Sequence, residues 1–587
     1  MYEKGLSYDP GAGKAPQTMR PVVMGHRHMI SAGHYLAAEA GFRILEAGGN
    51  AVDAGVAAGI ALGVVQSDLV SFAGVAPIMI RMARAKKPVT IDGLGVWPKA
   101  TEPERYFNEF RAIPAGLLRT VVPAAPDAWI TALARFGTMS FGEVAESAIR
   151  LARDGFAMHP LMAENIETFA DGYRRWPANA AIYLPQGRPP KVGEKFVQRD
   201  LARTLQYMVD QEKRAARRGR KAALKAARDA FYRGDIAKTF ADYHRKNGGT
   251  LTMDDMAAYR VEIGEPEKLR FHGADIYTCG PWCQGPVLLQ ALSLLESVDL
   301  AGLGHNSVAY IHTVAEALKL AFADRDRHYT DPRHARVPMA ALLSKRYAAE
   351  RRKLIRHDRA WTEMPPPGDP SGKGRRFSSS PQGPEEAGDV HPALDTSYVA
   401  VIDRHGNAFS ATPSDTSYNA PIVPGTGLCP SSRGSQSWAV EGHSAAVAPG
   451  VRPRLTPNPA MMVQEGRAVT PFGTPGGDVQ SQAMLQALLN VMVFGMDVQR
   501  AVETPRFATF SFPNSFEPHN YYPGRLNLEQ AVGADVGKRL AALGHQIEWW
   551  PDRTWRAGGM CMVAKDLKSG LLSGGADPRR PSYALGW

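Results

Sequence analysis

Thr396 stands where a linker-like stretch gives way to a strand-like run, and its hydroxyl could act as a nucleophile. A threonine hydroxyl is a poor nucleophile unless a base lies beside it. If the bond between Asp395 and Thr396 is broken, the new α-amino group becomes that base, because its pKa of about 7.7–8.0 lies near a working pH. The simpler interpretation is a threonine chosen for its β propensity, and the residue alone does not decide between the two.

Residues 362–391, shortly before Thr396, have the composition of a flexible linker. They contain three consecutive prolines, Pro365 to Pro367, three consecutive serines, Ser378 to Ser380, and further glycines and prolines. A cleavage point needs a mobile neighbour, because the new terminus must be freed and the old one must move away. We therefore expect a point of cleavage just after this linker.

The four cysteines give weak support to metal or disulfide chemistry. They are Cys279, Cys283, Cys429 and Cys561, too few for a disulfide scaffold. The first two have a C-x3-C spacing, but a structural zinc site needs a second Cys or His pair, and none stands out. We expect reduced thiols near a loop and no metal site.

A formal net charge of +11 permits an anionic partner such as a nucleic acid. Much of the excess lies between Lys213 and Arg228, where eight residues are Lys or Arg among alanines. No interleaved aromatic residues or groove-reading motif accompany this run, so we expect a solvated basic helix and no specific nucleic-acid partner. A basic binding protein with an inactive enzyme fold stays open as the alternative from another class.

The composition is that of a soluble globular protein, with 44% hydrophobic and 22% charged residues among 587. The N-terminal residues contain no apolar h-region of a secretory signal. The most apolar early stretch, residues 54–65, is too short to span a bilayer. We therefore expect a cytoplasmic protein with no membrane partner.

Helices and strands alternate along the chain, and two of the strands follow Thr396 directly. The predicted helices cover residues 35–47, 51–65, 140–154, 306–324 and 480–493, and the predicted strands cover 90–98, 397–403 and 408–412. Arg404 to Asn407 suit the turn of a β-hairpin, which places Thr396 at the start of the first hairpin strand. This mixture favours layers of helices and sheets over a parallel barrel.

Six ordered motifs carry a family resemblance. They are Gly48–Ala54 (GGNAVDA), Phe231–Ala237 (FYRGDIA), Ala321–Arg325 (AFADR), Asp395–Asp403 with Gly406 and Asn407, Pro424–Gly427 (PGTG) and Gly473–Gly477 (GTPGG). Each motif alone is weak, but their order over most of the chain is specific. Together they resemble the γ-glutamyltransferase family of N-terminal-nucleophile hydrolases.

The resemblance implies an α+β fold, a four-layer αββα sandwich built from one self-cleaved precursor. Cleavage between Asp395 and Thr396 would give a large subunit, 1–395, and a small subunit, 396–587, which together form one catalytic domain. The small subunit would begin with the nucleophile. No metal or organic cofactor is needed for this chemistry.

Three further residues match catalytic positions of the family. Gly476 and Gly477 resemble its oxyanion-hole pair, since glycines present backbone N–H groups without a side chain in the way. Ser414 falls where the family has a hydroxyl residue that supports the nucleophile. An ordinary Pro-Gly-Gly turn and a surface serine are the simpler alternatives.

The substrate-binding positions depart from the family pattern. Leu94 replaces an arginine that holds the substrate α-carboxylate, and Gln436 replaces an acid that holds its α-ammonium. Thr456 stands at a paired-serine site for the same carboxylate. Arg433 replaces a neutral residue, as in the cephalosporin-acylase-like and oxamate-amidohydrolase-like branches, although Ser432 departs from their Asn-Arg-Gly. Arg433 could bind an acid or dicarbonyl group, or pair with an acid of the protein.

These features predict an amide hydrolase that transfers an acyl group to water through a threonine acyl-enzyme. The expected substrate is a small amide whose acyl part is not a standard γ-glutamyl group. A true γ-glutamyl transpeptidase acting on glutathione is the first alternative. Leu94 and Gln436 make this alternative less favoured. The two subunits would be each other's partners, and a homo-oligomer of the heterodimer stays open.

Overall fold

Two antiparallel sheets of seven strands each lie face to face at the centre of the protein. The computed structural model describes residues 18–375, 377 and 396–587. One sheet, the β10 sheet, has the order β19 (Tyr583–Gly586), β2 (Met29–Ala32), β10 (Val399–Ile402), β11 (Ala408–Ala411), β3 (Ile78–Arg81), β4 (Val89–Ile91) and β7 (Ile263–Gly264). The other, the β13 sheet, has the order β1 (Val23–Gly25), β18 (Leu572–Ala576), β17 (Cys561–Asp566), β13 (Ala468–Gly473), β12 (Ala460–Gln464), β9 (Ala274–Thr278) and β8 (Glu267–Phe271).

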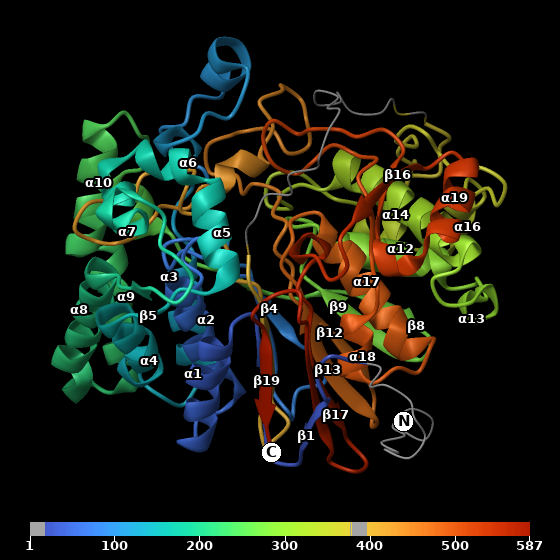
Figure 1. The fold of residues 1–587 in the computed structure, drawn as a ribbon. Coiled ribbons are helices and arrows are strands. Elements are labelled where there is room, and N and C mark those ends of the chain that lie inside the picture. The colour runs from blue at the N-terminus through green and yellow to red at the C-terminus, as the bar shows by residue number, and fades with distance from the viewer. Residues whose placement is uncertain (1–17, 376, 378–395) are drawn as a thin grey trace.

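Helices cover the outer face of each sheet (Figure 1). On the side of the β10 sheet lie α1 (Tyr35–Glu46), α2 (Ala51–Val65), α3 (Ala125–Phe136), α4 (Phe141–Asp154), α5 (Pro160–Thr168), α6 (Ala170–Arg174), α7 (Pro177–Tyr183), α8 (Arg199–Ala215), α9 (Arg220–Tyr232) and α10 (Asp235–Lys246), with α11 (Met253–Ala258) against α9 and α10. On the side of the β13 sheet lie α12 (Gly285–Leu295), α13 (Leu300–Leu303), α14 (Val308–His328), α16 (Lys345–Arg352), α17 (Val479–Met492), α18 (Val498–Glu503) and α19 (Ala534–Ala542), with α15 (Met339–Leu342) against α16.

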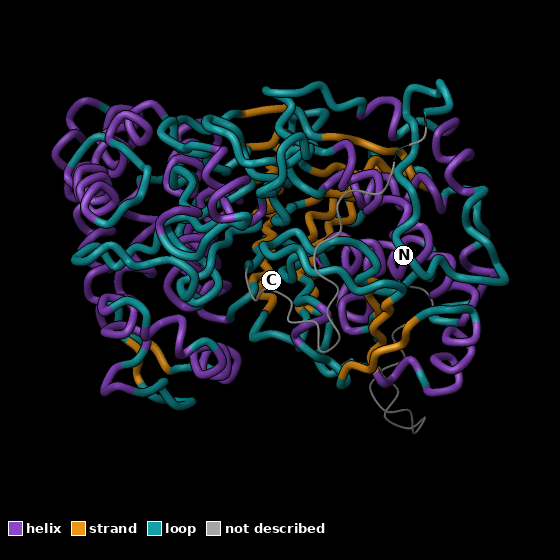
Figure 2. Tube along the Cα trace, turned by 90° about the horizontal axis from the view of Figure 1, so that it is seen from above, coloured by secondary structure: helices purple, strands orange, loops and turns teal. Residues whose placement is uncertain are grey.

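Two small sheets complete the fold. They are β14 (Phe507–Thr509), β15 (Arg525–Glu529) and β16 (Gln546–Trp550), and the pair β5 (Phe156–Ala157) and β6 (Lys195–Phe196). Seen from above, the strands form a central band between two groups of helices (Figure 2). The predicted α+β four-layer αββα sandwich is therefore confirmed.

Helix α2 shows how small residues bring a helix close to a sheet. The side chain of Asn50 accepts hydrogen bonds from the N–H groups of Val52 and Asp53, and Asp53 accepts one from the Asn50 N–H in return. All fifteen helix residues are buried. A Cβ on Gly55 would lie 2.1 Å from the Phe409 ring of β11, so only a glycine allows this approach.

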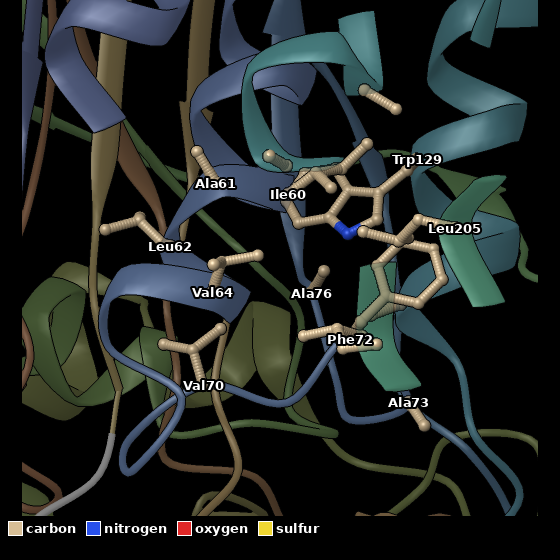
Figure 3. Close-up of a cluster of buried hydrophobic side chains, with 14 of the residues drawn as sticks. Ile60, Ala61, Leu62, Val64, Val70, Phe72, Ala73, Ala76, Trp129 and Leu205 are labelled. Carbon is tan, nitrogen blue, oxygen red and sulfur yellow. The ribbon is translucent and has the colours of Figure 1, made fainter. Parts of the chain in front are cut away.

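The outer side of α2 carries a large hydrophobic core. Trp129 from α3 packs beside Ile60 of α2, and Phe72 and Leu205 lie close by (Figure 3). A Cβ on Gly59 would meet the Trp129 ring at 2.5 Å. This close packing explains why the helix predicted over 51–65 has small residues on every face.

The hairpin predicted around Thr396 is confirmed. Strands β10 and β11 pair in antiparallel register, with Val399 opposite Ala411 and Ile402 opposite Ala408. Strand β10 also pairs with β2, so it lies inside the sheet rather than at an edge. The chain entering β10 is therefore held on both sides.

Two predicted elements are shorter or differently divided than expected. The strand predicted over 90–98 ends at Ile91, because Gly93 has φ +50° and approaches the Ala76 carbonyl too closely for a side chain. The basic helix predicted over 213–228 is interrupted at Gly219, where φ is +92°. Its Arg228 is buried against Asp127 rather than solvated.

The start of the predicted linker is anchored to the protein. The Gly368 N–H donates to Asp324 over 2.8 Å, and the Met364 N–H donates to the Tyr521 hydroxyl over 2.7 Å. Flexibility from residue 362 was therefore the wrong expectation for this part, because its backbone has buried partners. Residues 376 and 378–391, and the cleavage residue Asp395, lie outside the described residues.

No helix among the described residues has both the length and the apolar character needed to cross a membrane. The four cysteines are all buried free thiols.

Candidate active site

Thr396 is buried at the entrance to β10 in a strained backbone conformation. Its φ is +82°, a region that β-branched residues rarely adopt. The Thr396 N–H donates to the Leu69 carbonyl over 3.0 Å, and the next residue, Ser397, donates to the Pro413 carbonyl over 2.9 Å. Strained residues of this kind gather at functional sites, where the surrounding structure holds them in place.

The Thr396 hydroxyl lies 2.7 Å from the Ser414 hydroxyl. Ser414 is placed by the chain just after β11, where its backbone pairs with Val75. Arg433 donates a hydrogen bond from its guanidinium to the Ser414 oxygen. Because arginine has only donors, Ser414 accepts from it and keeps its own proton for another partner. The structure therefore joins the predicted nucleophile, its predicted supporting serine and Arg433.

Asp415, which sequence reasoning missed, anchors this group. Its carboxylate lies 3.7 Å from the Arg433 Nε. It accepts hydrogen bonds from the Ser431 hydroxyl at 2.6 Å and from the Ser432 N–H and hydroxyl at 2.9 and 2.7 Å. Burial raises the pKa of Asp415, and the Arg433 charge and the serine donors oppose that rise. Ser432, where the sequence departs from the related branches, thus holds the Asp415 carboxylate through two hydrogen bonds.

The predicted oxyanion pair forms a turn between β13 and α17. Gly476 has φ +123° and Gly477 has φ +55°, conformations that favour glycine. Within the described residues, neither amide N–H of this pair donates a hydrogen bond. The turn lies at the N-terminus of a fourteen-residue helix, where backbone N–H groups and the helix dipole favour negative charge.

A chain of contacts links this turn to Thr396. The Phe516 ring lies 3.4 Å from the position a Gly477 Cβ would take, and the Arg433 guanidinium lies 5.5 Å from the centre of the same ring. Arg433 in turn contacts Ser414, the neighbour of Thr396. The ring of Tyr398, the residue before β10, also packs on Gly473, at the end of β13.

A buried ion pair fixes the turn. Arg325 from α14 donates to Asp478, the residue after Gly477, and also to the Ser515 hydroxyl at 2.9 Å. Asp478 accepts hydrogen bonds from the Ser515 N–H at 2.7 Å and hydroxyl at 2.6 Å. Arg325 belongs to the AFADR motif, so the sequence already marked this residue. Its contact with the glycine turn is seen only in the structure.

The predicted substrate positions Gln436 and Thr456 lie together. The Gln436 amide donates to the Thr456 hydroxyl over 2.8 Å. Gln284 then connects them to the glycine turn, since its amide donates to the Thr456 carbonyl at 3.1 Å and the Gly477 carbonyl at 2.8 Å. Leu94 is fully buried in an apolar cluster that includes Leu455, the neighbour of Thr456. Its side chain offers no charge to a substrate carboxylate.

The described residues include one group that could hold a metal ion. His312, Glu316 and His545 are buried, with ligand atoms within 4.8 Å of one another. The buried Lys319 ammonium already donates to Glu316 over 2.8 Å, and thus supplies a cation there. His312 also lies 2.9 Å from His545, and its other ring nitrogen lies 2.6 Å from the Arg356 carbonyl. The proposed chemistry uses none of these groups.

Asp68, next to Leu69, should make the protein less stable as the pH rises. Burial raises its pKa to about 6, against the opposing hydrogen bond that the Asn165 amide donates over 2.7 Å. The unfolded chain then loses this proton at lower pH than the folded chain does. The contribution of protonated Asp68 to the free energy of unfolding is therefore complete below about pH 4. It is lost as the pH rises toward 6 and above.

Asp68→Asn tests this effect, because an amide keeps the shape and never ionises. The variant should gain up to about 3 kcal/mol over the parent between pH 4 and pH 8, which follows from roughly two units of pKa. The measurement is the melting temperature of both proteins at each pH. A difference that does not change with pH would show that Asp68 is ionised in the folded protein throughout.

Known proteins resemble the chain over nearly its whole length. Residues 37–587 match the family model described as gamma-glutamyltranspeptidase. The chain is 33% identical to the Acylase ACY 1 proenzyme of Pseudomonas sp. (strain SE83), over 94% of this chain and 92% of that protein. It is 30% identical to the Glutathione hydrolase-like YwrD proenzyme of Bacillus subtilis (strain 168), over 97% and 100%. The crystal structure of cephalosporin acylase from Bacillus halodurans superposes with a TM-score of 0.83 at 28% identity, covering 99% of both chains.

Proposed function

The chain belongs to the γ-glutamyltranspeptidase family, and we propose that it is an amide hydrolase in which Thr396 is the nucleophile after self-cleavage at Asp395-Thr396. The contact of 2.7 Å between the buried Thr396 and Ser414 hydroxyls carries this proposal. The positive φ of Thr396 supports it, since the fold holds the residue in a conformation that costs energy. Two relatives described as proenzymes also fit a chain that needs maturation.

Maturation begins when the Thr396 hydroxyl attacks the carbonyl carbon of Asp395. The C–N bond breaks, the acyl group moves to the threonine oxygen as an ester, and the nitrogen becomes the α-amino group. Water then hydrolyses the ester, which leaves a carboxylate on Asp395 and restores the Thr396 hydroxyl. Ser414, held by Arg433, orients the hydroxyl for this attack.

The mature site then transfers an acyl group to water. The α-amino group of Thr396 takes the hydroxyl proton while the oxygen attacks the substrate amide carbon. The Gly476 and Gly477 N–H groups stabilise the negative oxygen of the tetrahedral intermediate. The leaving amine takes the proton, an acyl-enzyme forms, and water releases the acid. A second tetrahedral intermediate uses the same donors.

The substrate-binding residues favour an acyl group without an α-ammonium. Leu94 is buried in an apolar cluster. Gln436 is neutral and donates a hydrogen bond to the Thr456 hydroxyl. The α-ammonium of a γ-glutamyl head would lose water there without a charged partner, and one missing charged partner typically costs about 2–5 kcal/mol. Arg433 supplies a positive charge and a planar fork suited to a carboxylate or paired carbonyl oxygens. We therefore propose an acyl group that carries an acid or dicarbonyl function.

The second candidate is a true glutathione hydrolase. The relative from Bacillus subtilis described as glutathione hydrolase-like is the observation that favours it. Glutathione and γ-glutamyl-p-nitroanilide discriminate between the candidates, because the first proposal expects them to be poorer than a glutaryl amide by roughly a hundredfold. Better turnover of the γ-glutamyl substrates would replace our proposal with this one.

Arg433→Met should slow hydrolysis of acidic acyl amides by at least about tenfold in kcat/KM, since one charged hydrogen bond is lost. The assay compares glutaryl, oxamoyl and acetyl p-nitroanilides on the parent and the variant. The neutral acetyl group controls for the contacts of Arg433 with Ser414 and Asp415. If acetyl and glutaryl amides slow by the same factor, Arg433 only supports the nucleophile and does not bind the acid.

Arg433→Lys provides a matched variant that keeps the charge but loses the fork. It should recover part of the rate on glutaryl amides and less of the rate on oxamoyl amides, whose two oxygens need paired donors. The melting temperature of each variant shows whether Asp415 still has a satisfactory partner. The cytoplasmic location and a homo-oligomer of the heterodimer stay predictions.

A further inference from the structure

Phe516 lies between the two ends of the proposed acyl-binding region. One edge of its ring lies 3.4 Å from the position of a Gly477 Cβ, and the Arg433 guanidinium lies 5.5 Å from its centre. The side chain is only partly buried, unlike the nearby Phe512, which is buried and stacked on Phe322. Phe516 therefore keeps some exposed surface close to groups that we assign to substrate.

The backbone on the N-terminal side of Phe516 is fixed to the glycine turn. Ser515 donates two hydrogen bonds to Asp478, at 2.7 Å from its N–H and 2.6 Å from its hydroxyl. Asp478 directly follows Gly477, and Arg325 holds both Asp478 and Ser515. The position of the Phe516 ring is thus coupled to the proposed oxyanion donors.

The backbone on the C-terminal side is fixed to the helical turn that carries Arg433. The Glu517 N–H donates to the Ser435 carbonyl over 2.8 Å, and the His519 N–H donates to the Phe516 carbonyl over 2.6 Å. The His519 ring stacks on Trp438 with centroids 3.9 Å apart, and lies 3.1 Å from the Ser437 carbonyl. The same short segment therefore spans from the glycine turn to Arg433.

We propose that Phe516 is the apolar wall of the acyl-binding subsite and selects for the spacer between the reacting carbonyl and a distal acid. The proposal rests on the proposed function, because it places the carbonyl at Gly476 and Gly477 and the acid at Arg433. Methylene or planar spacer groups then lie along the exposed ring surface, where contact with an aromatic face removes apolar area from water. The substrate class is an amide of a dicarboxylic or oxo acid with a short apolar spacer.

A series of p-nitroanilides tests the wall. Acetyl has no distal acid, and succinyl, glutaryl and adipoyl place one behind two, three and four methylenes. The matured parent is compared with Phe516→Ala, which removes the ring, and Phe516→Leu, which keeps apolar bulk. Phe494→Ala is the matched control, since Phe494 is also half-buried but follows the C-terminal end of α17, where it packs on His305 and Tyr310.

Phe516→Ala should raise KM for the best dicarboxylic amide by about tenfold and flatten the preference among spacer lengths. It should change kcat/KM for the acetyl amide by less than about twofold. Phe516→Leu should lie between the parent and Phe516→Ala, and Phe494→Ala should retain the preference of the parent. An equal loss on acetyl and dicarboxylic amides would overturn the proposal and make Phe516 a support for the glycine turn.

An unchanged spacer preference in Phe516→Ala would also overturn it. Failure of the proposed function looks different, because the parent itself would then remain uncut or hydrolyse neither acetyl nor dicarboxylic amides. A parent that prefers γ-glutamyl amides while Phe516→Ala still alters spacer preference would correct the acid-binding part alone.

Discussion

Thr396→Ala should purify as a single chain of 587 residues without amidase activity. The variant lacks the oxygen that attacks the Asp395 carbonyl, so neither the ester nor the new α-amino group forms. The parent should show two fragments on a denaturing gel, the smaller of which begins with Thr396. N-terminal sequencing and intact mass identify both fragments, and a p-nitroanilide assay measures the loss, which should be complete within detection.

Thr396→Ser is the matched control for this experiment. It keeps a hydroxyl 2.7 Å from Ser414 and should mature and hydrolyse amides, more slowly because serine lacks the methyl group that packs the buried site. A melting temperature of Thr396→Ala close to that of the parent would show that folding is intact. Active uncut protein, or a small fragment with a different first residue, contradicts the assignment of Thr396.

The sequence predicted the local structure around Thr396 because short-range signals determine it. The strand-like runs at 397–403 and 408–412 and the turn from Arg404 to Asn407 predicted the β10–β11 hairpin, which the structure confirms. The Asn50 cap and the glycines after Ala47 gave the bounds of α1 and α2 to within one residue. Ordered family motifs then supplied the αββα arrangement, which periodicity alone does not specify.

Long-range contacts explain what the sequence could not show. Asp415 follows Ser414 directly, yet its role depends on serines sixteen and seventeen residues later. Phe516 has no motif around it and meets Gly477 and Arg433 only in the folded chain. Side-chain contacts between such distant positions have no periodic or turn signature.

Two expectations came from composition that tertiary contacts partly overrode. The basic run at 213–228 was predicted as one solvated helix. Most of its basic side chains are exposed, but α8 ends at Ala215, the run is interrupted at Gly219, and Arg228 is buried against Asp127. The proline-rich start of the linker was predicted to be mobile, but Gly368 bonds Asp324. Charge and proline content describe average behaviour, and a buried partner can reverse it.

In our proposal, the catalytic step and the choice of acyl group depend on different parts of the site. The proposed hydrolytic step depends on Thr396, Ser414 and the glycine turn, which match the family pattern in sequence. The proposed choice of acyl group depends on Leu94, Arg433 and Gln436, where this chain departs from that pattern. Loss of the first group should abolish activity on every amide, whereas changes in the second should alter the ranking of amides.

Gly477→Val should lower kcat by about 100- to 1000-fold on every amide, because it displaces a donor to the oxyanion. A valine rarely adopts the φ of +55° found there, so the peptide must rotate. The Cβ itself would fit, since a Cβ on Gly477 would meet only the Phe516 ring, at an ordinary 3.4 Å. Rotation would also disturb the Gly477 carbonyl, which accepts a hydrogen bond from Gln284 over 2.8 Å.

Gly466→Val is the matched control, because Gly466 has φ +64° in the turn between β12 and β13 and a Cβ there meets nothing within 4 Å. Both valines impose similar backbone strain, but only Gly477 belongs to the proposed oxyanion site. The control should lose melting temperature and keep its kcat, while Gly477→Val should lose kcat with a similar change in melting temperature. Steady-state kinetics on the acetyl and glutaryl amides separate the two effects. A Gly477→Val protein with the kcat of Gly466→Val would remove the glycine pair from the mechanism, since the donors would then have no effect on the transition state.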